Sequence, residues 1–206
     1  MKTSSCLQPL FTLLEDHDIS YRLVEVEQDK KHVELFIHPD SKDDFNTVME
    51  TAGWNKIGSN TQKFNFIYRL IPDAFWGNSD QWTLHSACQM GCQSLSNLSK
   101  CMLPLDKSVQ NSIWNNKIRD KEYNCWRLTD EDYLIYLLAT AMFDEKCFDK
   151  ETILKINALG TEILDSSSLQ KKLEGVFFCF TSELIQHIKE GRFSEMFHDF
   201  MTFRKY

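Results

Sequence analysis

The spacing of apolar residues changes near residue 100, and this change constrains the fold more than any other feature of the sequence. Before it, segments with helical spacing alternate with extended segments in which apolar and polar residues alternate. After it, the apolar segments have helical spacing. The pattern therefore predicts an α+β protein in which a mixed subdomain and a helical subdomain meet near residue 100.

In the first half, two strands separated by a charged turn suit a hairpin. A helix with apolar residues from Leu7 to Leu14 precedes them, and a helix with an apolar stripe from Phe45 to Ala52 follows, with Gly53 at its C-terminal cap. The expected strands cover residues 21–26, 32–37, 54–57, 64–70 and 82–85, and the last of these is expected to end the sheet.

In the second half, helices are expected at residues 107–116, 133–143, 149–159, 173–188 and 193–203. Thr129 is a good N-cap, and Asp130, Glu131 and Asp132 suit the first turn of a helix better than a metal site. The helix at 133–143 is apolar nearly all round, so it should form the centre of the helical subdomain. The alternating charges from Lys146 to Lys155 suggest a solvated face.

Composition excludes several classes of protein. The 23 Lys and Arg residues against 30 Asp and Glu give a net charge of −7, which argues against a nucleic-acid binder that neutralises phosphates. Only seven glycines and four prolines make a Gly/Pro-rich linker or a turn-dense β-sandwich improbable. The 42% hydrophobic content is enough for a packed core.

The sequence also predicts a cytoplasmic location. Acidic residues at Glu15, Asp16 and Asp18 interrupt the N-terminal region before an apolar signal segment could form, and no run reaches the 18 apolar residues of a membrane span. The seven cysteines are odd in number and scattered, so we expect reduced thiols.

Several short segments, taken in order, resemble one family. They are Ile19–Leu23, Val33–Asp40 (VELFIHPD), Ala52–Lys56 (AGWNK), Leu103–Leu105, Trp126–Leu134 (WRLTDEDYL) and Phe143–Lys146 (FDEK). Together they resemble the small bacterial nucleotidyltransferase-like proteins, which have the fold of the DNA polymerase β superfamily and are associated with surface-polysaccharide or peptide-modification gene clusters. The resemblance implies a nucleotidyltransferase-like α+β domain at 1–100, with a small mixed sheet and helices on one side, and a helical subdomain at 101–206.

Transferred to this chain, the family's metal site is largely lost. The three acids of the family correspond to His32, Glu34 and Thr83, so one carboxylate remains. Two Mg²⁺ ions need shared carboxylate ligands. The Gly-Ser turn that would hold nucleotide phosphates is also replaced, by Gln28–Lys31. Without the resemblance, Glu34 would be interpreted as a solvated, outward-facing strand residue.

The candidate site residues follow from this comparison. Glu34 and His32 are the candidate catalytic residues, and Lys30, Lys31 and His85 are the candidates for holding a nucleotide. No metal or cofactor is expected, whereas Mg²⁺ and a nucleoside triphosphate would be needed if the site were active.

The spacing of His85, Cys88, Cys92 and Cys101 offers a zinc site as an alternative. A thiolate–imidazole pair of His85 with Cys88 or Cys92 would be a candidate nucleophile. Buried reduced cysteines are the simpler interpretation of all of them.

Three functions remain open from the sequence. The first is a catalytically degenerate nucleotidyltransferase-like protein that acts as a binding or accessory module in a bacterial biosynthetic pathway, with a protein or peptide partner. The second is an active Mg²⁺-dependent nucleotidyltransferase that uses a nucleoside triphosphate. The third is a protein- or peptide-interaction protein that binds no nucleotide.

Overall fold

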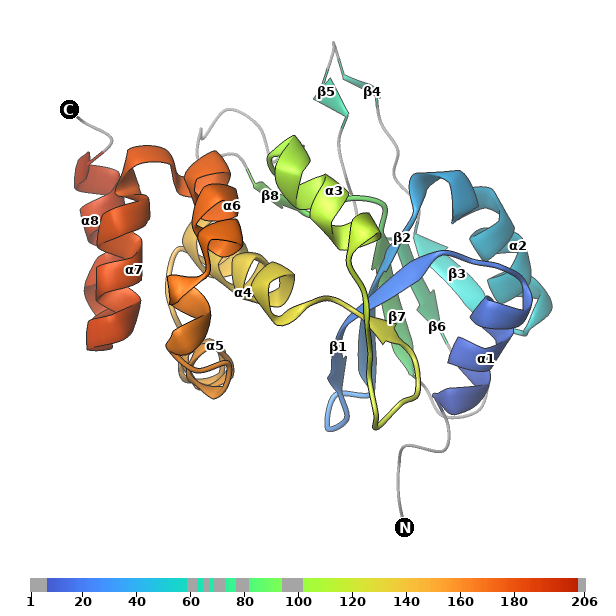
Figure 1. Cartoon of the computed structure of the whole chain (residues 1–206). Coiled ribbons are helices and arrows are strands. Elements are labelled where there is room, and N and C mark those ends of the chain that lie inside the picture. The colour runs from blue at the N-terminus through green and yellow to red at the C-terminus, as the bar shows by residue number, and fades with distance from the viewer. Residues whose placement is uncertain are drawn as a thin grey trace.

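The structure is a computed structural model, and it describes residues 7–58, 63–64, 67–68, 73–76, 82–93 and 102–203. The fold is α+β, with a mixed sheet between two groups of helices (Figure 1). The strands are β1 (Tyr21–Glu27), β2 (His32–Ile37), β3 (Asn55–Gly58), β4 (Lys63–Phe64), β5 (Ile67–Tyr68), β6 (Asp73–Trp76), β7 (Thr83–Ala87), β8 (Gly91–Gln93), β9 (Met102–Pro104), β10 (Ile118–Arg119) and β11 (Trp126–Arg127). The helices are α1 (Gln8–Asp16), α2 (Lys42–Thr51), α3 (Lys107–Asn115), α4 (Asp130–Ala139), α5 (Lys150–Ala158), α6 (Ser167–Phe177), α7 (Thr181–Glu190) and α8 (Phe193–Phe203).

The main sheet has seven strands in the order β10-β11-β1-β2-β7-β6-β3. Strands β1 and β2 form the predicted antiparallel hairpin, while β7 pairs parallel to β2 and β11 pairs parallel to β1. The expectation that the strand at 82–85 ends the sheet was wrong, because β10 and β11 follow it in the chain. The expected strand at 64–70 lies partly outside the described residues, which show the short pair β4–β5 there.

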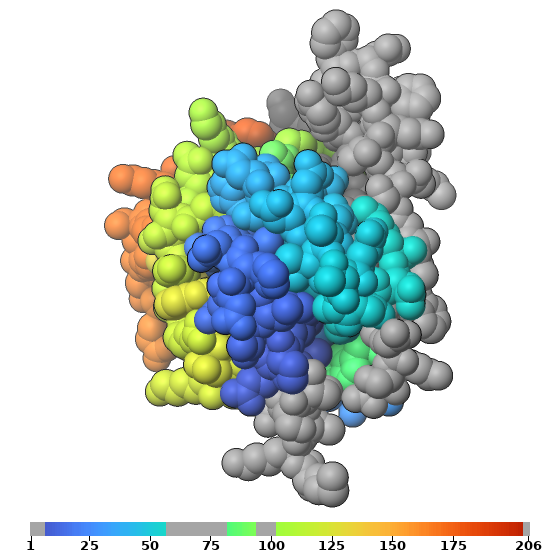
Figure 2. All heavy atoms as spheres, turned by 90° about the vertical axis from the view of Figure 1, so that its right-hand side faces the viewer, coloured from blue at the N-terminus to red at the C-terminus, as the bar shows by residue number. Residues whose placement is uncertain are grey.

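Helices α1 and α2 cover one face of the sheet, and Figure 2 shows them side by side on the surface. Their apolar residues, among them Phe11 and Phe45, pack against Val33, Leu35 and Leu84 of the central strands. This first core confirms the apolar stripes predicted for the two helices, except that Ala52 is exposed and lies at the C-cap of α2. Gly53 follows α2 with φ of 85°, the left-handed conformation expected at this helix end.

The opposite face is covered by the helices of the second half. Val24 and Phe36 contribute to this second core from the sheet, and the fully buried Leu138 of α4 lies within it. The helices of the first half, α1 and α2, thus lie on one side of the sheet, as expected, and the helices of the second half cover the other side. Both faces are covered because neighbouring residues of a strand point to opposite sides. In β2, Val33 and Leu35 face the first core, whereas Phe36 faces the second.

Arg22 joins β1 to the C-terminal end of α3. Its guanidinium donates hydrogen bonds of 2.9 Å to the carbonyl oxygens of Ile113 and Trp114. These carbonyls lie in the last turn of the helix, where intrahelical partners are missing. These hydrogen bonds pair the donors of a buried guanidinium and fix α3 against the sheet.

The acids at the start of α4 interact with the helix dipole, and two of them also form ion pairs with a lysine of α6. Thr129 Oγ1 accepts a hydrogen bond from the Asp132 amide at 3.2 Å, as its N-cap role predicts. The Asp132 carboxylate is fully buried, and it accepts a 2.9 Å hydrogen bond from Lys172 of α6. Lys172 also lies 2.8 Å from Glu131 and donates to Ser112 of α3 at 3.1 Å. One ammonium group therefore links three helices.

The expected single helix at 173–188 is two helices, because the chain turns at Phe178. Phe178 has φ of 53°, a conformation that an L-residue with a side chain rarely adopts. A 3₁₀ turn at Phe178–Phe180 separates α6 from α7. Helix α4 is likewise shorter than expected and continues into a π-helical turn at Thr140–Glu145. Among the described residues, none of the helices has the length and apolarity to cross a bilayer.

Candidate functional site

One face of the sheet carries a cluster of polar side chains on three adjacent strands. Glu34 lies beside Glu25 of β1 on one side and beside His85 of β7 on the other. His32 lies two residues before Glu34, so it points to the same face, opposite Glu27. Glu25, Glu27, His32, Glu34 and His85 therefore share the face toward α4 and α5. We call these five residues the polar face.

A β-bulge in β1 places the two glutamates of β1 on this face. The register between β1 and β2 shifts between Leu23 and Glu25, which leaves Val24 as the extra residue. Without the bulge, Glu25 would pair with Val33 and point into the core beneath α1 and α2. Bulges commonly re-aim side chains next to functional sites. This feature could not be recognised from the alternation of residues in β1.

His32 and His85 contact each other edge to face, with ring centroids 4.5 Å apart. Burial lowers the pKa of both imidazoles, and the adjacent His32 lowers the pKa of His85 further. Both rings are therefore neutral at pH 7 and can each offer one donor and one acceptor nitrogen. The structure thus brings together two residues that the sequence assigned to separate roles.

Glu34 is the central residue of the cluster. The hydroxyl of Tyr136 in α4 donates a 2.6 Å hydrogen bond to Glu34 Oε2. Burial raises the pKa of Glu34 to about 7, although the bond from Tyr136 acts in the opposite direction. Burial and the adjacent Glu34 raise the pKa of Tyr136 well above its usual value, so the phenol keeps its proton. The interpretation of Glu34 as a solvated, outward-facing residue was wrong.

Lys155 of α5 lies over the two glutamates of β1. Its ammonium forms ion pairs with Glu25 and with Glu151, the latter at 2.7 Å. Burial alone would lower the pKa of Lys155, but the hydrogen bonds with Glu151 and Glu25 raise it above its usual value. The expectation of a solvated face from Lys146 to Lys155 was therefore wrong for Lys155, whose side chain is mostly buried.

Lys30 and Lys31 lie in the turn between β1 and β2. Lys30 pairs with Glu27 at 2.7 Å and lies 3.9 Å from Glu151. The Lys31 carbonyl accepts a hydrogen bond from the Thr83 amide at 2.8 Å. Lys31 itself has a φ of 48°, in the left-handed region. The charge of Lys30 is thus directed to Glu27 of the polar face and to Glu151.

Carboxylate oxygens of Glu25, Glu27 and Glu151 all lie within 4.8 Å of one another, a spacing that could hold a cation. Lys155 and Lys30 already supply the positive charge there. At the positions of the family's acids, the side chains are His32, Glu34 and Thr83, with His85 on the same face. Glu34 is the one carboxylate among these side chains, and its Oε2 already accepts a hydrogen bond from Tyr136, so these residues do not fit a pair of Mg²⁺ ions.

The residues of the alternative zinc site do not come together in the part of the chain that the structure describes. His85 lies within β7 and Cys92 lies within β8. The ligand atoms of these two residues and of Cys88 do not all lie within 4.8 Å of one another. Cys101 lies outside the described residues. Burial raises the pKa of the Cys92 thiol to about 12, which disfavours a nucleophilic thiolate. Cys92, Cys125, Cys147 and Cys179 form no disulfide.

Comparisons with known proteins do not identify a family for this chain. No family model matches the chain, and no curated protein matches it. Among solved structures, the chain is similar to the antibiotic-resistance factor ANT(2'')-Ia, with a TM-score of 0.48 and 8% identity over 92% of this chain and 100% of that one. At this similarity two chains need not share a fold, so the function is inferred from the sheet and side chains of this protein.

Proposed function

We propose that this protein is nucleotidyltransferase-like, lacks metal-dependent transfer activity of its own, and acts as a binding or accessory module in a bacterial pathway of surface-polysaccharide synthesis or peptide modification. Support for the class comes from the motif resemblance together with the topology. A hairpin, a helix over one face and a returning strand parallel to β2 place the motif positions on one face of the sheet. A helical half covers that face.

The observation that carries the proposal is the state of Glu34. A metal-ligating carboxylate must be ionised and must present its oxygens to the metal. Glu34 has a pKa raised to about 7 by burial, and one oxygen accepts a hydrogen bond from Tyr136. Its neighbours His32 and His85 carry no negative charge that could compensate a second cation.

The electrostatics are unfavourable for two divalent ions. Four positive charges would face a partly ionised Glu34 and two imidazoles whose pKa values burial has lowered. The nearby acids Glu25 and Glu27 are already paired with Lys155 and Lys30. At His32, Glu34 and Thr83 the negative charge and the hard oxygen ligands are therefore too few for a two-metal site, and lysines already pair with the neighbouring acids.

The test is a transfer assay with labelled ATP, GTP, CTP and UTP, in Mg²⁺ or Mn²⁺, with and without bacterial lysate. We expect no label transfer from the wild-type protein or from Glu34→Gln. Transfer that Glu34→Gln abolishes would establish the alternative, an active nucleotidyltransferase that uses Glu34. Transfer that survives this substitution would also contradict the proposal and would direct attention to acids elsewhere in the chain.

Thermal unfolding in the presence of nucleotides separates the remaining possibilities. Stabilisation by a nucleotide that does not depend on Mg²⁺ would indicate a degenerate pocket that still binds. Stabilisation that requires Mg²⁺ would contradict the absence of a metal site. As a matched comparison, His32→Asp with Thr83→Asp restores three carboxylates at the family's positions. We expect this variant, unlike the wild type, to be stabilised by Mn²⁺.

A further inference from the structure

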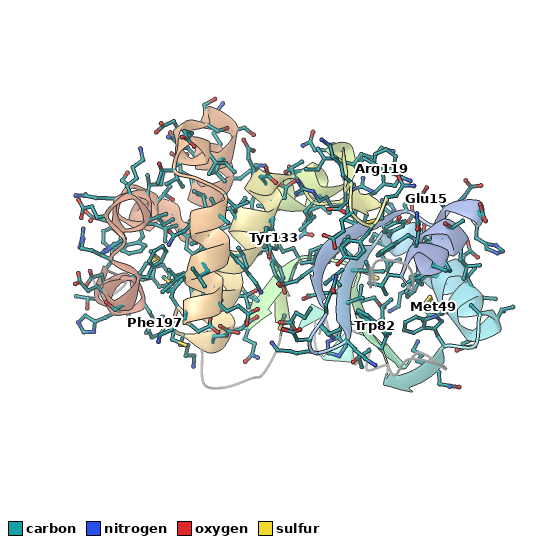
Figure 3. All side chains as sticks on the ribbon, turned by 90° about the horizontal axis from the view of Figure 1, so that it is seen from below. Glu15, Met49, Trp82, Arg119, Tyr133 and Phe197 are labelled. Carbon is teal, nitrogen blue, oxygen red and sulfur yellow. The ribbon has the colours of Figure 1, made fainter. Side chains whose placement is uncertain are left out.

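A cleft of about 380 Å³ lies beside the polar face, between β1, the β10–β11 hairpin and helices α4 and α5. Its apolar lining includes Val24 and Leu128, and the rings of Tyr123 and Tyr133 flank this surface. Figure 3 shows Tyr133 in the space between the helices and the sheet. In the described part of the chain, the Tyr133 hydroxyl has no hydrogen-bond partner, so it is available to a ligand.

The charges around the cleft are predominantly negative. Glu25, Asp120 and Glu122 line it together with two cations, Lys155 and Arg127. Both cations are already neutralised by acids, because Lys155 pairs with Glu25 and Glu151 and Arg127 lies 2.8 Å from Asp130. Asp120 is 3.8 Å from the same arginine.

Glu122 is the acid that lacks a counter-charge. Its carboxylate accepts a long, 3.5 Å hydrogen bond from Gln28, and it forms no ion pair with the described residues. Glu122 is exposed on the hairpin turn, at the mouth of the cleft. A cation that enters the cleft would therefore meet an unneutralised carboxylate at the rim and the Tyr133 hydroxyl further in.

The shape favours a projecting side chain over a free small molecule. Sites for small molecules usually enclose most of the ligand surface, whereas this cleft is largely open to solvent. Lysine and arginine have an aliphatic stem that packs on apolar surface and a charged head that stays near water. The apolar lining of the cleft can contact such a stem, and the acidic rim can contact the charged head.

We propose that this cleft binds a lysine or arginine side chain of a partner polypeptide. The inference deepens the proposed function, because it gives the accessory module a partner of stated chemistry. It rests on that function only for the expectation of a partner. Nucleotide transfer would contradict the proposed function without affecting peptide binding, and a failure of peptide binding would leave the transfer assay unaffected.

The test uses capped pentapeptides with one central residue among glycines, titrated into the full-length, isotope-labelled protein and followed through backbone amide chemical shifts. The central residue is lysine, acetyl-lysine or glutamate. Acetyl-lysine retains the aliphatic stem and removes the charge, whereas glutamate reverses the charge on a shorter stem. Free n-butylamine tests whether the amine alone is sufficient. We expect saturable shifts at the cleft, including Glu25 and Tyr133, with the lysine peptide and not with the acetylated or acidic peptides.

Two variants locate the interaction. Glu122→Lys reverses the exposed rim charge and should weaken binding of the lysine peptide by about fivefold or more, and Tyr133→Phe should weaken it by about two- to fivefold. Glu174→Lys makes the same change on the exposed face of α6 and should leave the affinity unchanged. Equal binding of the acetylated peptide, equal affinity for n-butylamine, or no effect of Glu122→Lys would each overturn the proposal.

Discussion

The hydroxyl of Tyr136 donates a 2.6 Å hydrogen bond to Glu34 and so joins helix α4 to strand β2 across 102 positions of the chain. The bond places a carboxylate with a raised pKa at the contact between the helical half and the sheet. Proton binding at this residue is therefore coupled to the packing of the two parts.

Glu34→Gln should change the pH dependence of stability. Because the pKa of Glu34 is raised to about 7 in the folded protein, the native state holds this proton more tightly than the unfolded chain. The wild-type free energy of unfolding should therefore fall as the pH rises through the range from about 4.5 to 7, by about 1–3 kcal/mol relative to Glu34→Gln. Urea unfolding at several pH values measures this difference. Identical pH profiles for the two proteins would contradict the assignment, and the exposed substitution Glu174→Gln serves as a control.

Lys172→Met should be strongly destabilising. The substitution retains most of the volume but leaves Asp132, which is fully buried, without its ammonium partner. Breaking a buried ion pair on one side costs about 3–5 kcal/mol. Adding Asp132→Asn removes the uncompensated charge and should recover at least half of the loss. Urea unfolding measures the effect, and the exposed neighbour Lys171→Met should change the stability by less than about 0.5 kcal/mol.

Phe178→Gly should not destabilise the protein, although it removes an entire aromatic ring. Phe178 has φ of 53°, which glycine adopts freely, and its side chain is 70% exposed. Relief of about 1–3 kcal/mol of backbone strain should exceed the added entropy of the unfolded chain. We expect a gain of about 1 kcal/mol in thermal or urea unfolding. Phe180→Ala, at a buried ring two residues away, should instead cost about 3–5 kcal/mol. A loss as large as this at position 178 would show that the ring contributes to packing.

Leu138→Asp should prevent stable folding. Leu138 lies in the last turn of α4 and is completely buried, so the substitution places an unpaired carboxylate in the second core. Burial of such a group costs several kcal/mol, which is a large part of the stability of a domain. We expect an insoluble product, measured as the soluble fraction after expression, with Leu154→Asp at an exposed site as the control. A soluble Leu138→Asp protein with cooperative unfolding would contradict the placement of α4.

The sequence predicted the elements whose signals are local. The β1–β2 hairpin, the stripe of α2 and the N-cap at Thr129 depend on neighbouring residues, and the structure confirms them. Strands β10 and β11 are two residues long and carry Arg119 and Arg127, so no alternation marks them. The turn at Phe178 was missed for a different reason, since no glycine or proline stands there.

The site was predictable only in part. Two-residue spacing put His32 and Glu34 on one face, but nothing local to β1 indicated the bulge that adds Glu25 and Glu27 to it. Tyr136 and Lys155 reach the polar face from α4 and α5, and their sequence neighbourhoods show only an apolar helix and a run of charges. Contacts of this range depend on how the halves pack, which a single sequence does not specify.

The parallel pairing of β11 with β1 has a consequence for synthesis on the ribosome. Leu128 donates its amide to the Leu23 carbonyl at 3.1 Å, so β1 receives this neighbour from more than one hundred positions later in the chain. While the nascent chain is shorter than that, the hairpin presents one edge of β1 without its native partner, and such edges promote pairing with other chains. A nascent chain stalled near residue 100 would thus expose an unpaired edge of β1 that can pair with other chains. Synthesis and folding of β11 then cover this edge.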